Sequence, residues 1–244
     1  MSDVREVLEK AYKELAEKDF PDGDRIRFIA ELGASDDIDY HYKLICDSWK
    51  SGRRLYLENS FDRHGSDGLE FLLKKISEAE DEAIKVLTEY LIAEILSKSR
   101  HRDFYAGFCK RLIPILIYEI KTCDEVLRRK LIIALGFVAS SKDIEFLTRQ
   151  MLSDDDALCR VWSASSLMQM SFHGVSKEEV CEASKDAFAK VLSEEKDIQA
   201  CGLILESVQT LYGKKWVSSS AVDDVDEAKI EKGRKSALRF LSKL

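Results

Sequence analysis

Two stretches of the sequence, Asp124-Glu-Val-Leu-Arg-Arg-Lys-Leu-Ile-Ile-Ala-Leu-Gly136 and Asp156-Ala-Leu-Cys-Arg-Val-Trp-Ser-Ala-Ser-Ser-Leu-Met168, follow the same pattern. Each begins with Asp, has Arg four residues later, and has Leu seven residues after the Arg. The matched positions lie 32 residues apart: Asp124 and Asp156, Arg128 and Arg160, Leu135 and Leu167. A repeat with a period of roughly 20 to 50 residues is typical of stacked arrays, whose members bury their apolar faces against one another. The sequence therefore predicts one helix of a repeating structure, present twice.

The spacing recurs near the N-terminus, where Arg25 is followed seven residues later by Leu32 and then by Gly33. Weaker copies without the Arg run from Ile84 to Leu91 and from Ile198 to Leu205. The intervals between the copies are unequal. We therefore expect insertions, or helices of altered length, between some repeats.

This pattern resembles that of the HEAT-repeat family, built from paired antiparallel helices, the second of which has an Asp, then an Arg, then small residues ending in Leu-Gly. The resemblance is good over roughly residues 100–212, fair over 1–34 and poor from Asp36 to Asp67. It implies an all-α, right-handed superhelix of about 12–13 antiparallel helices, in which the Asp and Arg tie neighbouring repeats together. By this likeness the structural positions are Arg25, Leu32, Asp124, Arg128, Leu135, Asp156, Arg160 and Leu167.

The composition also predicts an all-α fold. Charged residues make up 34% and hydrophobic residues 45% of the chain, and 2 Pro and 11 Gly leave little material for the turns of an all-β fold. We expect one domain over residues 1–244, with an irregular insertion at about 53–68 and a charged terminal cap at about 222–244. The polar tract 97–102 is the best candidate for a domain boundary, but arrays run through such joints, so we expect no division there.

Apolar periodicity and helix-breaking residues predict the helices themselves. Pro114 removes an amide donor and is expected to kink the helix that contains it. A short helix is expected at about 55–62. The longer predicted helices are 3–18, 22–32, 37–51, 67–76, 80–96, 103–120, 124–140, 142–152, 155–171, 176–193, 196–212 and 223–243.

Net charge and hydropathy limit the partners. A net charge of −7 and a pI near 5.3 argue against broad nucleic-acid binding, which requires a positive surface. No apolar run reaches the ~18 residues of a membrane span, and the N-terminus lacks the apolar core of a secretory signal. We expect a cytoplasmic protein that does not contact a membrane. The cysteines are spread along the chain and are predicted to be buried, reduced thiols: Cys46, Cys109, Cys123, Cys159, Cys181 and Cys201.

The sequence contains no complete catalytic motif. His101-Arg102-Asp103 matches the catalytic-loop tripeptide of protein kinases, but Phe108 stands where a kinase requires a metal-binding Asn. No Gly-X-Ser-X-Gly turn is present, and the four His residues are never one helical turn apart. We therefore expect no catalytic residues, no bound metal and no cofactor.

Charge is nevertheless distributed unevenly. Between Ser97 and Lys130 nine basic residues stand against four acidic ones. A basic stripe interleaved with Phe104, Tyr105 and Phe108 would suit a phosphate or an acidic peptide. The alternative interpretation is a solvated face whose aromatic residues belong to the core. The candidate binding residues are Arg102, Lys110, Arg111, Arg129 and Lys130.

These patterns favour a non-catalytic binding or scaffold protein that engages a protein partner with a charged surface through an extended surface of its own. One concrete version is a toxin-neutralising immunity protein, an acidic inhibitor of a basic effector. The alternative from another class is a HEAT-like DNA glycosylase or another nucleic-acid-binding repeat protein. Against the glycosylase stand the acidic charge and the lack of a Trp-Asp-Arg constellation around Trp49, Trp162 or Trp216.

Overall fold

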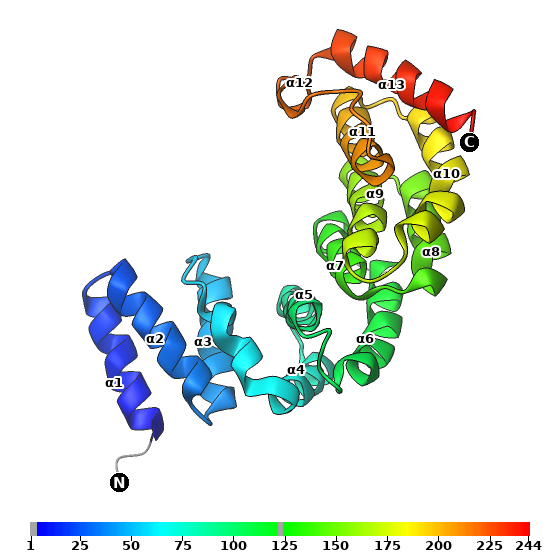
Figure 1. The fold of residues 1–244 in the computed structure, drawn as a ribbon. Helices are drawn as coiled ribbons and strands as arrows, with labels where there is room; N and C mark the ends of the chain where they lie inside the picture. Colours follow the sequence, from blue (N-terminus) through cyan, green and yellow to red (C-terminus); the bar gives the residue numbers. More distant parts are fainter. Residues whose placement is uncertain (1–3, 122–123) are drawn as a thin grey trace. The chain divides into compact units, whose positions relative to one another are not determined.

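The computed structural model describes residues 4–121 and 124–244. Over these residues the chain forms thirteen α-helices, α1–α13, and two 3-10 helices, η1 and η2, with no β-strand (Figure 1). The predicted all-α class is confirmed. Most of the predicted helix boundaries agree with the observed ones to within a few residues, because they depend on local caps and on apolar spacing.

The chain packs as two compact units, an N-terminal unit of residues Met1–Ile95 and a C-terminal unit of residues Leu96–Leu244. The division falls inside α5 (Glu82–Lys98), just ahead of the polar tract 97–102. A single domain over residues 1–244 stays a prediction.

The N-terminal unit is assembled around a 3-10 helix. Its elements before α5 are α1 (Val4–Glu17), α2 (Asp22–Ala34), α3 (Ile38–Ser51), η1 (Leu57–His64) and α4 (Gly65–Glu78). The helix η1 occupies the stretch that we expected to be irregular, and it packs against α2, α3 and α4. Leu57 and Phe61 of η1 are 1% exposed, so this segment is part of the core.

The C-terminal unit consists of helices that pack in two rows. Its remaining elements are α6 (Tyr105–Ile120), α7 (Glu125–Val138), η2 (Ser141–Asp143), α8 (Ile144–Ser153), α9 (Ala157–Phe172), α10 (Lys177–Glu194), α11 (Ile198–Tyr212), α12 (Ser219–Asp223) and α13 (Glu227–Leu241). In one row α7 packs on α9 and α9 on α11, and in the other α8 packs on α10 (Figure 1). The last helix, α13, packs against both α10 and α11.

Side-chain caps explain where many of these helices begin. In the C-terminal unit the carboxylates of Asp124, Asp156 and Asp197 accept hydrogen bonds from the first free amides of α7, α9 and α11. Helix α12 was not predicted, because residues 217–221 read as a polar connection. It forms because the Ser218 hydroxyl caps it and Val222 is buried, 1% exposed.

The Leu-Gly that ends two of the repeated patterns has a steric purpose. A Cβ atom at Gly136 of α7 would lie 2.7 Å from Cβ of Ser166 on α9, closer than side chains approach. The absence of a side chain lets the Ser166 hydroxyl donate to the Ile132 carbonyl at 2.8 Å. The N-terminal unit repeats this contact: Gly33 faces Ser60, whose hydroxyl donates to the Ile29 carbonyl. In both places the accepting carbonyl lies four residues before the Gly.

Candidate protein-binding surface

Two buried ion pairs of identical design join successive helices of the C-terminal unit. Arg128 of α7 makes two hydrogen bonds of 2.9 Å to the carboxylate of Asp154, which lies two residues before the cap of α9. Arg160 of α9 makes hydrogen bonds of 2.7 and 2.8 Å to Glu195, two residues before the cap of α11. Each carboxylate also accepts the amide of the cap residue at 3.0 Å. Arg128 and Arg160, which occupy equivalent positions in the repeated sequence pattern, thus make equivalent contacts.

The burial of these carboxylates makes the loss of either arginine costly, because a buried charge would be left without its partner. The side chains of Asp154 and Glu195 are each 2% exposed, whereas those of Arg128 and Arg160 are 18% and 19% exposed. Burial opposes the ionisation of Glu195, but hydrogen bonds from Arg160 and from the Asp197 amide outweigh it and lower the pKa of Glu195. A carboxylate held in this way fixes the position of one helix relative to the next.

A second type of pair joins an Arg to the capping Asp of a later helix. Arg129 of α7 bonds both carboxylate oxygens of Asp156, the cap of α9, at 2.9 and 2.6 Å. The Arg129 guanidinium lowers the pKa of Asp156. In the N-terminal unit Arg5 of α1 bonds Asp37, the cap of α3, at 2.7 and 2.8 Å. Nothing in the repeated pattern singled out Arg5 or Asp37.

The remaining repeat positions divide between core and surface. Leu32, Leu135 and Leu167 are fully buried, 0% exposed. Asp124 caps α7 through the amides of residues 126 and 127. Among the described residues Arg25 pairs with Asp22, one helical turn earlier, at 2.7 Å, so it does not repeat the long-range pairs of Arg128 and Arg160.

An apolar groove lies between α9 and α11, with a volume of about 360 Å³. One wall is formed by a single face of α9, with side chains at helical spacing: Leu158, Val161, Trp162, Ser165 and Met168. The other wall is the facing side of α11: Leu203, Glu206, Ser207 and Thr210. Leu158 and Trp162 are 38% and 37% exposed, so large apolar side chains remain in contact with water at the rim. Apolar surface gathered at a groove makes it a candidate for binding a partner.

The neighbouring helix α7 continues this exposed surface. By the 32-residue register Val126 corresponds to Leu158, and Val126 is 60% exposed. Lys130 corresponds to Trp162 and is also exposed. The two helices pack side by side, so equivalent positions on them present a mixed apolar and basic surface.

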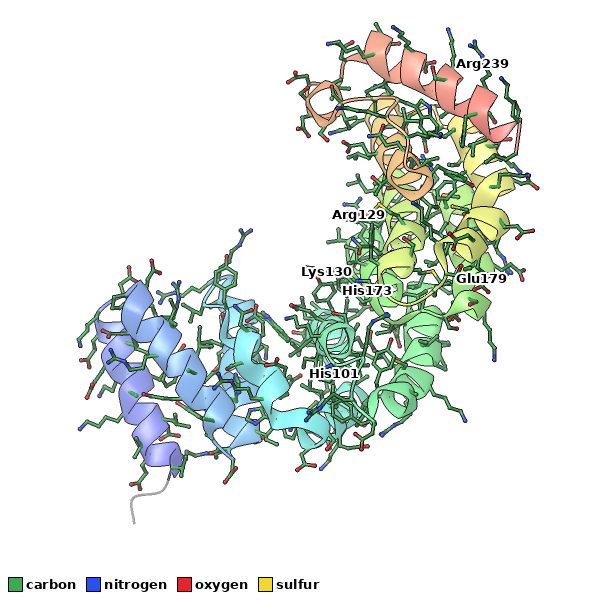
Figure 2. All side chains as sticks on the ribbon, viewed as in Figure 1. His101, Arg129, Lys130, His173, Glu179 and Arg239 are labelled. Atoms are coloured by element: carbon green, nitrogen blue, oxygen red, sulfur yellow. The ribbon has the colours of Figure 1, made fainter. Side chains whose placement is uncertain are left out.

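The predicted basic residues are brought only partly together. Lys110 and Arg111 are on α6. Arg129 and Lys130, which Figure 2 labels, are on α7, and α7 packs against α6. Arg129 is half-buried and its charge is matched by Asp156, whereas Lys110, Arg111 and Lys130 are exposed. Arg129 thus joins two helices, whereas the other three basic residues lie at the surface.

The aromatic residues of the basic tract support its arginines and also enter the core. Cζ of Arg102 lies 5.8 Å from the centre of the Phe104 ring, and Cζ of Arg111 lies 5.4 Å from the centre of the Phe108 ring. Phe108 is only 5% exposed, and burial raises the pKa of Tyr105 to about 12. These rings therefore contribute to packing as well as holding exposed guanidinium groups.

Formal charge is divided unequally between the two units. Residues 1–95 contain 14 basic and 23 acidic residues, a net charge of −9. Residues 96–244 contain 24 basic and 22 acidic residues, a net charge of +2. The acidity of the protein thus belongs to its N-terminal unit.

A pair of histidines lies inside the N-terminal unit. Nδ1 of His41 is 2.8 Å from Nε2 of His64, and Nε2 of His41 is 2.8 Å from the Leu57 carbonyl oxygen. A carbonyl only accepts, so Nε2 of His41 holds the proton and Nδ1 accepts from His64. Burial lowers the pKa of His41 to about 4 and also lowers that of His64, which lines a pocket with Asp36, Arg63 and Asp67.

We expect the stability of the N-terminal unit to fall in mild acid. Unfolded His41 takes up a proton near pH 6.5, whereas the folded side chain resists protonation down to about pH 4. The unfolded state therefore binds more protons in this window, and the free energy of unfolding drops by about 2 kcal/mol between pH 7 and pH 5. The measurement is urea unfolding followed by Trp49 fluorescence, with Trp162 and Trp216 changed to Phe.

The matched variant is His41→Gln, whose amide keeps the donor to the Leu57 carbonyl but does not titrate. It should be less stable at pH 7 and should show a smaller change between pH 7 and pH 5. His101→Gln, at an exposed position, should keep the full change. An unaltered pH slope in His41→Gln would refute this assignment.

The cysteines are held as thiols. Those in the described part of the chain are free, and burial raises the pKa of Cys159 to about 12 and of Cys201 to about 11. A thiol with a raised pKa is a poor nucleophile and acts as a small apolar side chain. Cys123 lies outside the described residues. Within residues 4–121 and 124–244, no three His, Cys, Asp or Glu side chains are grouped so as to hold a metal ion.

In comparisons with known proteins, no family model, no curated protein and no solved structure matches the chain. In the described residues, no helix has both the length and the apolar character needed to cross a lipid bilayer.

Proposed function

We propose that this protein is a non-catalytic, HEAT-like helical-repeat protein that binds another protein through the exposed face of α7, α9 and α11. The single observation that carries this proposal is the apolar groove between α9 and α11, with Leu158 and Trp162 over a third exposed. Tryptophan is among the residues that contribute most to protein–protein binding, so an exposed one at a groove is a strong candidate for an anchor.

The repeat architecture is supported by the two equivalent ion pairs. Arg128 with Asp154 and Arg160 with Glu195 join consecutive helices of one row through the same geometry. In a HEAT-like solenoid, each repeat is held by its neighbours in this manner and the row of helices forms an extended, rigid surface. Rigidity favours binding, because little conformational entropy is then lost on association.

The partner is proposed to be basic. The N-terminal unit has a net charge of −9, and an acidic surface increases the rate at which a basic protein is encountered. The toxin-neutralising immunity protein remains the concrete version of this proposal that the charge favours. A DNA glycosylase is not favoured, since Glu206 lines the groove and a carboxylate repels a phosphate backbone.

The test is affinity purification with the whole protein as bait, in lysate of the native cell, at about 0.1 M and about 1 M salt. We expect a basic protein to be retained at the lower concentration and reduced at the higher one, and the purified pair to bind with the same salt dependence. An unrelated bait of the same net charge is the control. Retention of no protein beyond that control, together with a gel shift of duplex DNA at low salt, would replace this proposal with the nucleic-acid alternative.

A further inference from the structure

The groove between α9 and α11 differs from a small-molecule pocket. Trp162 and Leu158 at its rim are partly exposed, whereas a small-molecule site encloses most of its ligand. Its walls are two helical faces of the same row, with side chains projecting at positions three and four residues apart. Ridges of side chains on a third helix fit between two helices in this arrangement. The shape therefore suits a helix better than a compact ligand.

Glu206 gives the groove its charge. Of the described residues that line it, Glu206 alone is charged, and it is half-buried on α11. The Ser219 hydroxyl donates to Oε1 of Glu206 at 2.6 Å and holds the carboxylate in place. Within the described part of the chain Oε2 of Glu206 accepts no hydrogen bond, so this oxygen is left to accept from another molecule. A carboxylate beside apolar surface favours a partner with a Lys or Arg next to its apolar face.

We propose that this groove binds an amphipathic helix of the partner protein, with large apolar side chains against Trp162 and Leu203 and a Lys or Arg paired with Glu206. The inference rests on the proposed function and names the partner's recognition element. Apolar residues at i, i+3, i+4 and i+7 of such a helix anchor it in the groove. A second copy of this chain and a small apolar molecule are the competing occupants.

The test uses the full-length protein and a displayed library of 16-residue helices. Leu occupies the apolar positions i, i+3, i+4 and i+7, and the flanking positions are randomised. We expect selected peptides to be enriched in Lys or Arg at one flanking position. Trp162→Ala should weaken the best peptide at least tenfold, whereas Phe172→Ala, an exposed aromatic on α9 outside the groove, should not change its affinity.

Charge reversal distinguishes pairing with Glu206 from general attraction. Glu206→Lys should weaken binding of the basic peptide about tenfold. A peptide in which Glu replaces the base should bind this variant with restored affinity. Glu182→Lys, at an exposed position of α10, makes the same change in net charge and should have no comparable effect. Circular dichroism and the unfolding midpoint verify that each variant is folded.

Three outcomes would overturn the inference. Selected peptides insensitive to Trp162→Ala and Glu206→Lys would place binding elsewhere, and no selected peptide at all would remove the helix as occupant. Self-association lost in Trp162→Ala would assign the groove to a second copy. Failure of this inference can be told apart from failure of the proposed function. If affinity purification retains a protein partner equally well with wild type and with Trp162→Ala, the protein binds a partner but not through this groove.

Discussion

Replacing Arg160 with Met should lower the free energy of unfolding by about 3 kcal/mol, the cost of a buried charge left without its partner. Met keeps much of the length and apolar bulk of Arg but removes the hydrogen bonds to Glu195. The carbonyl oxygens of Asp154 and Asp155 also lose a donor. Urea unfolding followed by tryptophan fluorescence, in a Trp49→Phe background, measures the loss in the C-terminal unit.

The control is another arginine in an ion pair. Arg149 bonds Glu145 at 2.8 Å, but the two side chains are 67% and 84% exposed. Exposed pairs contribute little because water screens them, so Arg149→Met should cost no more than about 0.5 kcal/mol. Adding Glu195→Gln to Arg160→Met should recover part of the lost stability, because the uncompensated charge is removed. Equal losses in Arg149→Met and Arg160→Met would show that the Arg160 pair does not join the helices.

Two Gly→Ala substitutions should have opposite effects on stability. At Gly136 the new methyl group would meet Cα of Ser166 at 2.9 Å and its hydroxyl oxygen at 2.7 Å, so α7 and α9 must move apart. We expect Gly136→Ala to lower the free energy of unfolding by about 2 kcal/mol, as overpacking of a core does. Urea unfolding in the Trp49→Phe background again provides the measurement.

Gly107 of α6 is the matched position. It is exposed, and a Cβ atom there would meet nothing within 4 Å. Gly107→Ala therefore adds only helix propensity and should raise stability by up to about 1 kcal/mol. Stabilisation by both substitutions would mean that the contact between Gly136 and Ser166 does not limit the approach of α7 and α9.

The candidate site was only partly predictable. The 32-residue register identified Arg128 and Arg160, but not their partners Asp154 and Glu195. Arg129 was placed in a basic binding stripe, because a sequence does not reveal that Asp156 matches its charge. The basic stripe, the protein partner and the HEAT-like superhelix stay predictions.

One signal in the sequence points to the groove. Leu158, Trp162 and Ser165 occur at helical spacing, and Trp162 stands where the preceding repeat has Lys130. A residue that corresponds to an exposed Lys is itself expected to be exposed. The facing wall, with Leu203 and Glu206, could not be assigned, because the copy of the pattern on α11 lacks the Arg that sets the register.

By itself, the sequence determined most of the helices and their ends, because a 3.6-residue apolar period, an Asp or Ser cap and a terminating Gly all act within one or two turns. Tertiary packing decided which side chains meet. Arg160 meets Glu195 across 35 residues of sequence, and His41 meets His64 across 23. The Ser166 hydroxyl meets the Ile132 carbonyl, one helical turn before Gly136. These contacts depend on how far one helix slides and turns against the next. That displacement is set by the close approach of whole helices, which no local preference specifies.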